Sequence, residues 1–216
     1  MARWTVSSSE RKEALAAAAE QELDSLQQQG VRMADNAFSP IVLVKGDLNE
    51  EELAGGQLLA GADGTALRAA LSALGYAPED FCGLAAIAGS FEEGMAPSGV
   101  VEGEPLPADL FREALEALDP EAVVLLDDRA ADLMRQAYAE ELADIENFDT
   151  AMLLPGLVAH VLGRRVLALG GFEAALADPH EKQVMWAYLK QLPPEGRRTS
   201  GRDSARYMQT RCFPHF

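Results

Sequence analysis

Apolar positions along the chain switch between a helical and a strand-like spacing. A stripe of apolar residues from Leu15 to Leu26 recurs at helical spacing and predicts a helix over residues 9–29, which Gly30 ends. The next apolar run, residues 41–44, is continuous, which is typical of a strand buried on both faces of a parallel sheet. The chain therefore begins as a helix followed by a buried strand.

The same alternation continues to residue 192. The further elements that we expect are a helix with Leu67, Leu71 and Leu74 inward that Gly75 ends, a strand at 81–87, a long surface loop at 89–107, a helix at 107–118, a strand at 122–126, and a helix that Asp128 caps and that runs to about Leu142. Residues 157–162 and 166–169 are expected to form a short hairpin or two adjacent strands, and a last helix starts at Asp178-Pro179. Helices alternating with strands predict an α/β fold, a three-layer α/β/α sandwich with a mainly parallel sheet of about four or five strands.

Length and composition are those of one globular domain with an appendage. The chain has 216 residues, of which 48% are hydrophobic. No apolar run approaches the roughly 20 residues that a membrane helix needs, and the first residues lack an apolar signal segment, so we expect a cytoplasmic protein without a membrane partner. We divide the chain into one α/β domain, residues 1–192, and a basic, partly disordered tail, residues 193–216.

Charge is distributed unevenly between these two parts. The whole chain has a net charge of −17, but the tail carries five Arg against two acids, a net +3, which leaves −20 on residues 1–192. Because nucleic-acid affinity rests on Lys and Arg side chains that neutralise phosphates, this field disfavours DNA as a partner. A body this acidic could instead imitate nucleic acid and occupy a DNA-binding protein. The last ten residues hold three aromatics and a Met, so the tail is either an interaction peptide or a segment that folds back on the acidic body or stays a flexible linker.

Few residues have the spacing of a metal or redox site. Cys82 and Cys212 lie 130 positions apart and form neither a disulfide framework nor a metal knuckle, so we expect reduced thiols. His160 lies in an apolar run and is more typical of a core residue than of a metal ligand. The acidic runs at 50–52 and 140–141 are most simply solvated faces. We therefore predict no metal and no cofactor.

The loops after the predicted strands carry a family resemblance, and in an open α/β sheet ligands bind at such loops. The segments that carry it are Gly46-Asp47 after the first strand, Gly56-Gln57-Leu58-Leu59-Ala60-Gly61-Ala62-Asp63-Gly64 before a leucine-striped helix, Leu118-Asp119-Pro120-Glu121-Ala122-Val123-Val124-Leu125-Leu126 with Ala130-Ala131, and residues 166–176 with Asp178-Pro179. They resemble the uracil-DNA glycosylase superfamily, most closely its iron–sulfur bacterial type. The resemblance spans roughly residues 10–192 in order and implies that family's fold.

The positions that do this family's chemistry hold different residues here. The family flips uracil out of DNA, stacks it on an aromatic ring, reads it with an Asn and stabilises the leaving anion with a His. In this chain the ring position falls on Leu59, the Asn position on about Ala85, and the H-P-S triplet with its His becomes Gly171-Phe172-Glu173. The four cysteines that hold the family's iron–sulfur cluster are also absent, so the resemblance implies no cluster.

Some positions of this degenerate pocket keep residues like those of the family. Asp47 stands where the first motif has an acid, which makes it the candidate catalytic residue, although a turn-closing role fits it better. Gly46 precedes it in the same turn. Gly61 and Gly64 are better explained by turn geometry than by a phosphate cradle, because no Lys follows them as in a P-loop.

Taken together, the residues favour a uracil-DNA glycosylase-like domain that is catalytically inactive. Such a domain would act as an interaction module, with a protein or a small ligand as its partner. The alternative is an enzyme, a divergent DNA glycosylase or nucleotide-processing enzyme that uses Asp47 and backbone donors to hydrolyse an N-glycosidic bond.

Overall fold

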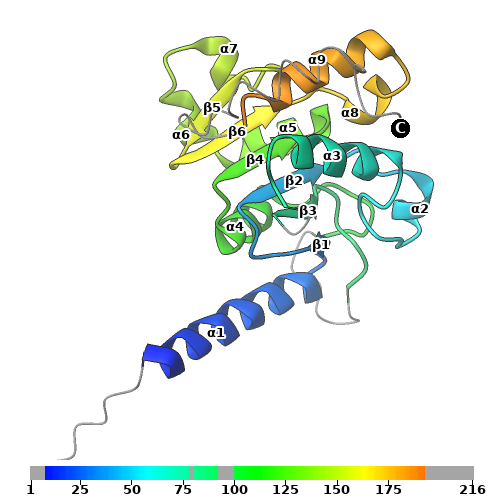
Figure 1. Ribbon diagram of the computed structural model, residues 1–216. Helices are drawn as coiled ribbons and strands as arrows, with labels where there is room; N and C mark the ends of the chain where they lie inside the picture. Colours follow the sequence, from blue (N-terminus) through cyan, green and yellow to red (C-terminus); the bar gives the residue numbers. More distant parts are fainter. Residues whose placement is uncertain (1–7, 78–79, 92–99, 193–216) are drawn as a thin grey trace, which may run out of the picture.

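Helices and strands alternate along the part of the chain that the computed structural model describes, residues 8–77, 80–91 and 100–192 (Figure 1). In chain order the elements are α1 (Ser8–Gln28), β1 (Met33–Asp35), β2 (Ile41–Lys45), α2 (Glu50–Leu53), α3 (Ala62–Ala73), β3 (Phe81–Ala85), α4 (Ala108–Leu118), β4 (Ala122–Leu125), α5 (Asp128–Ala137), α6 (Ala139–Ala143), α7 (Phe148–Ala151), β5 (Val158–Val161), β6 (Arg164–Ala168), α8 (Phe172–Ala175) and α9 (Pro179–Leu189). The tail expected at residues 193–216 lies outside the described residues.

One six-stranded mixed sheet connects these elements. Its strand order is β1-β3-β2-β4-β6-β5. The four inner strands are parallel, and one antiparallel strand lies at each edge. Because the inner strands are parallel, their carboxyl ends all meet at the same end of the sheet. The α/β class that the sequence predicts is confirmed.

Helices cover both faces of the sheet, which gives the fold three layers (Figure 1). Val42 and Val44 of β2 point to the face covered by α1, α4, α5 and α6. Ile41 and Leu43 point to the opposite face, which α3, α8 and α9 cover. This alternation follows from the two-residue period of a strand, and it explains why every residue of β2 is buried.

The number of strands differs from the expected four or five. The strand that the sequence does not reveal is β1, which has three residues of mixed exposure and therefore no readable alternation. The predicted hairpin is present as β5 and β6, joined at Leu162 and Gly163. Both turn residues have positive φ, 48° and 83°, which is the backbone of a tight type I′ hairpin turn.

The helix expected from Asp128 to about Leu142 begins one residue earlier and is interrupted. Asp127, not Asp128, is its N-cap, because the Asp127 side chain accepts a hydrogen bond from the Ala130 amide. The helix then ends at Tyr138, whose φ of −123° and ψ of 35° are not helical, and α6 continues the path to residue 143. The sequence prediction was wrong at both points. For the N-cap, Asp127 and Asp128 are equally suitable by residue type, so the sequence does not decide between them.

The first helix is buried over only part of its length. Leu23 and Leu26 belong to the core, but Leu15, which the sequence places on the same stripe, is 66% exposed. Figure 1 shows the N-terminal half of α1 projecting beyond the other elements. Among the described residues, neither α1 nor any other helix combines the length and apolarity needed to cross a membrane.

The segment expected to be a surface loop, residues 89–107, is partly core. Val100 and Leu106 are buried, and Ile87 forms an antiparallel bridge with Pro105. The segment therefore folds back along the end of β3. Residues 92–99 of it lie outside the described residues.

Cys82 provides a test of this packing. It lies in β3 with no exposed surface, and burial raises the pKa of its thiol to about 12. Because the thiolate is the reactive form, we expect that Cys82 in the folded protein does not react with a disulfide reagent at pH 8. A Cys212→Ser variant, which leaves Cys82 as the sole thiol, should react only as fast as the protein unfolds and completely in denaturant. Reaction of the folded variant at the rate of a free thiol would contradict the packing.

Candidate functional site

The loops after the four inner strands meet, as the sequence analysis expects for a ligand site. The Ala86 amide after β3 donates to the Lys45 carbonyl (2.8 Å), which joins the β3 and β2 ends. The amides of Gly171 and Phe172 after β6 both donate to the Leu126 carbonyl after β4 (3.0 and 2.8 Å). These bonds fix the positions of the loops, and the side chains between them form the candidate site.

A buried lysine lies at the centre of this region. Lys45, the last residue of β2, is 3% exposed, and its Nζ atom lies 2.7 Å from Glu52 Oε2 and 2.6 Å from Asp63 Oδ2. Glu173 Oε2 lies 3.0 Å from the same nitrogen. An ammonium group has three donors, so the three carboxylates satisfy it fully. We call these four residues the Lys45 cluster.

The carboxylates come from three separate elements. Glu52 is in α2, Asp63 in the first turn of α3, and Glu173 in α8. Glu52 and Asp63 are 1% and 2% exposed, whereas the Glu173 side chain is 51% exposed. Three carboxylates around one ammonium leave the cluster with two excess negative charges. Asp63 Oδ1 is buried and accepts no hydrogen bond from the described residues.

Glu52 also organises the loop between β2 and α3. Its Oε2 atom accepts a hydrogen bond from the Asn49 amide (2.9 Å), and its Oε1 atom accepts one from the Leu59 amide (2.8 Å). The Asn49 side chain in turn caps the Glu52 amide, which completes a capping box. Glu52 thus connects the turn after β2, the segment before α3 and the buried ammonium.

The cluster keeps Lys45 charged. Burial alone lowers the pKa of the Lys45 ammonium, but the contacts with Asp63, Glu52 and Glu173 outweigh it, so the pKa is raised above the ordinary value. The folded pKa therefore exceeds the unfolded one. The resulting stabilisation is complete at neutral pH and is lost as the pH rises beyond the ordinary lysine pKa of about 10.4.

Asp47, the candidate catalytic acid, is not among the residues that bind Lys45. Its side chain is 63% exposed and forms an ion pair with Arg129 (3.0 Å). The acid that closes the turn is Asp127, which is buried and whose Oδ2 atom accepts hydrogen bonds from the amides of Gly46 and Asp47 (2.7 and 2.9 Å). A Cβ atom at Gly46 would lie 2.5 Å from the Arg129 Cβ, so only glycine fits there.

The positions that the sequence resemblance assigns to a uracil pocket hold packed framework residues. Leu59 is buried and contacts β3 near Gly83, and Ala85 is fully buried at the end of β3. Gly61 is the N-cap of α3. Gly64 lies so close to the Leu59 carbonyl that a Cβ atom would come within 1.7 Å of that oxygen. These glycines serve helix entry and close packing.

The triplet aligned with H-P-S divides between the core and the Lys45 cluster. Gly171 has a φ of 108° and is the N-cap of α8, while the Phe172 ring is buried against α9. Glu173 binds Lys45. The two described histidines lie elsewhere: His160 is exposed on the edge strand β5, which corrects its expected place in the core, and His180 is exposed at the start of α9.

Both acidic runs, which were expected to be solvated faces, contain a residue that forms an ion pair with a residue of another element. Glu50 and Glu51 are exposed, but Glu52 is buried in the Lys45 cluster. Glu141 binds Arg112 (2.5 Å), which holds the pKa of that carboxyl below its ordinary value. Composition alone did not show these partners, because they come from other elements. The capping-box spacing from Asn49 to Glu52 was the one local signal.

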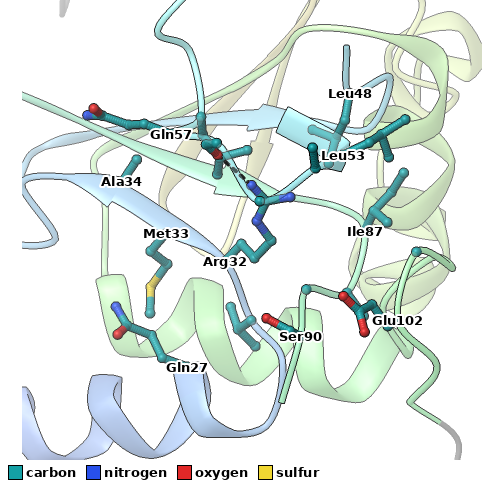
Figure 2. A pocket seen from close by; sticks show the side chains of 18 residues that line it. Gln27, Arg32, Met33, Ala34, Leu48, Leu53, Gln57, Ile87, Ser90 and Glu102 are labelled. Atoms are coloured by element: carbon teal, nitrogen blue, oxygen red, sulfur yellow. Dashed lines mark hydrogen bonds between the residues drawn. The ribbon is translucent and has the colours of Figure 1, made fainter. Parts of the chain in front are cut away.

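A pocket of about 630 Å³ lies on the other side of α2, between that helix, β1 and the end of β3 (Figure 2). Arg32 extends into this region and donates to the carbonyls of Glu52 (2.6 Å) and Gly56 (2.8 Å). The wall of the pocket combines the apolar side chains of Leu48 and Ile87 with polar residues such as Ser90. The volume is within the range of small-molecule sites. No sequence motif marks Arg32, Ile87 or Ser90 as part of a site.

Among the described residues, no group of His, Cys, Asp or Glu side chains has the arrangement of a metal site. A scan against models of known protein families finds no match to this chain, and a search of curated proteins finds none either.

Substitution of Lys45 tests how much the cluster contributes to stability. Lys45→Met leaves Glu52 and Asp63 buried without their cation, so we expect a loss of about 3–5 kcal/mol in the free energy of unfolding, measured by urea titration. Glu173→Gln is the matched control, because Glu173 is half exposed and its pairing contributes within about 1 kcal/mol. Equal losses in the two variants would contradict the assignment of a buried cluster.

Proposed function

We propose that this chain is a uracil-DNA glycosylase-like domain that has no glycosylase activity and works by binding. The observation that carries the proposal is the Lys45 cluster. At the strand ends where the resemblance places the reaction, a lysine ammonium and three carboxylates bind one another instead of a substrate. A site for uracil would need an aromatic ring, an amide and an imidazole at these positions.

The side chains present would act against the reaction. Leu59 offers no ring face and Ala85 no side-chain hydrogen bond. The Glu173 carboxylate would repel both a DNA phosphate and a developing uracil anion. The charge on the Lys45 ammonium is already neutralised by buried carboxylates, so it offers little to an incoming anion.

The exposed rim of the strand ends is also unsuited to DNA. Asp47, Glu50, Glu51 and Asp128 are exposed there, and Arg129 is the basic side chain that pairs with Asp47. Since DNA binding depends on neutralising phosphates, this rim disfavours the duplex. A protein or a small ligand is therefore the proposed partner, and for a small ligand the pocket beside Arg32 has sufficient volume.

A single-turnover assay separates this proposal from the enzyme alternative. Oligonucleotides that contain uracil or hypoxanthine are incubated with excess protein, and abasic sites are revealed by alkaline cleavage. We expect no base release above the protein-free background, either from the wild-type chain or from Asp47→Ala. A gel-shift experiment at low ionic strength, where charge effects are strongest, should show no retained DNA.

The alternative enzyme predicts the opposite pattern. Base release by the wild-type chain that disappears in Asp47→Ala would overturn the inactive domain and favour a divergent glycosylase. The Asp47 side chain is exposed, so this substitution leaves the fold intact and the comparison is interpretable.

A further inference from the structure

The C-terminal end of the described chain lies beside a segment with exposed apolar side chains. Leu192, its last residue, is buried, and Gln191 Nε2 donates to the Gly156 carbonyl (2.9 Å). The Tyr188 ring also lies against Gly156. The described chain therefore ends next to the turn between α7 and β5.

That turn carries four large apolar side chains that the described residues leave exposed. Phe148 is 74% exposed and Leu154 is 44% exposed, and Met152 and Leu157 are exposed to similar or lesser degrees. The segment is held together locally, since the Met152 amide donates to the Phe148 carbonyl (2.9 Å) and the Leu157 amide to the Leu154 carbonyl (3.2 Å). Four such residues in ten positions are more than the scattered exposure of an ordinary surface. We call them the α7 patch.

Acidic side chains flank the α7 patch. Asp144, Glu146 and Asp149 are exposed on the same segment. The nearby cation Arg135 is engaged with Asp132 and with the Met152 carbonyl. The surface thus combines apolar contact area with negative charge.

The tail has the complementary composition. Residues 193–216 carry a net charge of +3, and the last ten residues contain Tyr207, Met208, Phe213 and Phe216. We propose that residues 207–216 dock on the α7 patch of the same molecule, with their aromatic side chains against the patch and Arg211 facing the flanking acids.

Chain length allows this contact without strain. The 14 residues from Pro193 to Arg206 could span about 45–50 Å if extended, and the patch is adjacent to their starting point. A linker this short holds the two surfaces at an effective concentration in the millimolar range, so even a weak contact is populated. Intramolecular docking is therefore favoured over capture of a separate peptide.

Other exposed apolar residues are less suitable for the tail. Leu15 belongs to α1, Phe38 to the segment after β1 and Leu53 to α2, whereas α7 lies next to β5, the edge strand farthest from β1 in the sheet (Figure 1). Charge alone would not select a surface, because the whole body is acidic. The combination of chain exit, apolar side chains and acids distinguishes the α7 patch.

The native Cys212 allows a direct test in the full chain. A nitroxide spin label on Cys212 broadens the amide signals of nearby residues in a ¹⁵N-labelled sample, and the buried Cys82 stays unlabelled, which a Cys212→Ser control confirms. We expect loss of signal intensity at residues 144–157. Leu154→Ser should restore these signals, while the control Leu15→Ser, which removes an exposed leucine from α1 (66% exposed against 44% for Leu154), should leave the broadening unchanged.

A mixed sample identifies the molecule that carries the bound tail. Chain at natural isotope abundance, with the nitroxide on Cys212, is mixed with ¹⁵N-labelled Cys212→Ser chain, which carries no nitroxide. We expect no broadening in this mixture. Broadening of residues 144–157 in the mixture would show that the patch binds the tail of a second copy, which overturns the intramolecular contact. Broadening elsewhere, or none in the single-chain sample, would overturn the docking itself.

Discussion

A buried ammonium group at the end of β2 binds three carboxylates, which come from α2, α3 and α8. Moving one lysine and two acids out of water is costly, and the cost is offset only because each donor of Lys45 meets an oxygen within 3.0 Å. Glu52 and Asp63 are as buried as the lysine, so each depends on the same cation. The loop after β2 and the start of α3 therefore form as one unit with the sheet.

This constraint connects the fold to the proposed function. Open α/β sheets bind ligands where parallel strands end, and in this chain the Lys45 cluster lies there. The Glu52 carboxylate binds Lys45 in the cluster, and the Glu52 backbone carbonyl accepts a hydrogen bond from Arg32 beside the pocket. Helix α2 therefore separates the cluster from the pocket. In the proposed function, binding would therefore take place around the strand ends, because the groups at the ends themselves are bound to one another.

The sequence predicted the fold more fully than the site. Continuous apolar runs identified β2, β3, β4 and the hairpin, because burial on both faces leaves a strong local pattern, whereas the three residues of β1 leave none. The four loops of the site followed from the rule that ligands bind beyond the carboxyl ends of the strands in an open α/β sheet. The Lys45 cluster did not, since its members lie up to 128 positions apart and no periodicity relates them. The assignments of Glu52 to a solvated face and His160 to the core failed because neighbouring residues in sequence do not reveal which partner each side chain meets.

A double-mutant cycle between Lys45 and Glu52 tests the central claim most directly. The free energy of unfolding is measured by urea titration for the wild-type chain, Lys45→Met, Glu52→Gln and the double variant. A buried, mutually dependent pair predicts a coupling energy of about 2–3 kcal/mol, because the second substitution removes a charge that the first left unpaired. A coupling energy below about 0.5 kcal/mol would mean that the two groups act independently, and it would contradict the account.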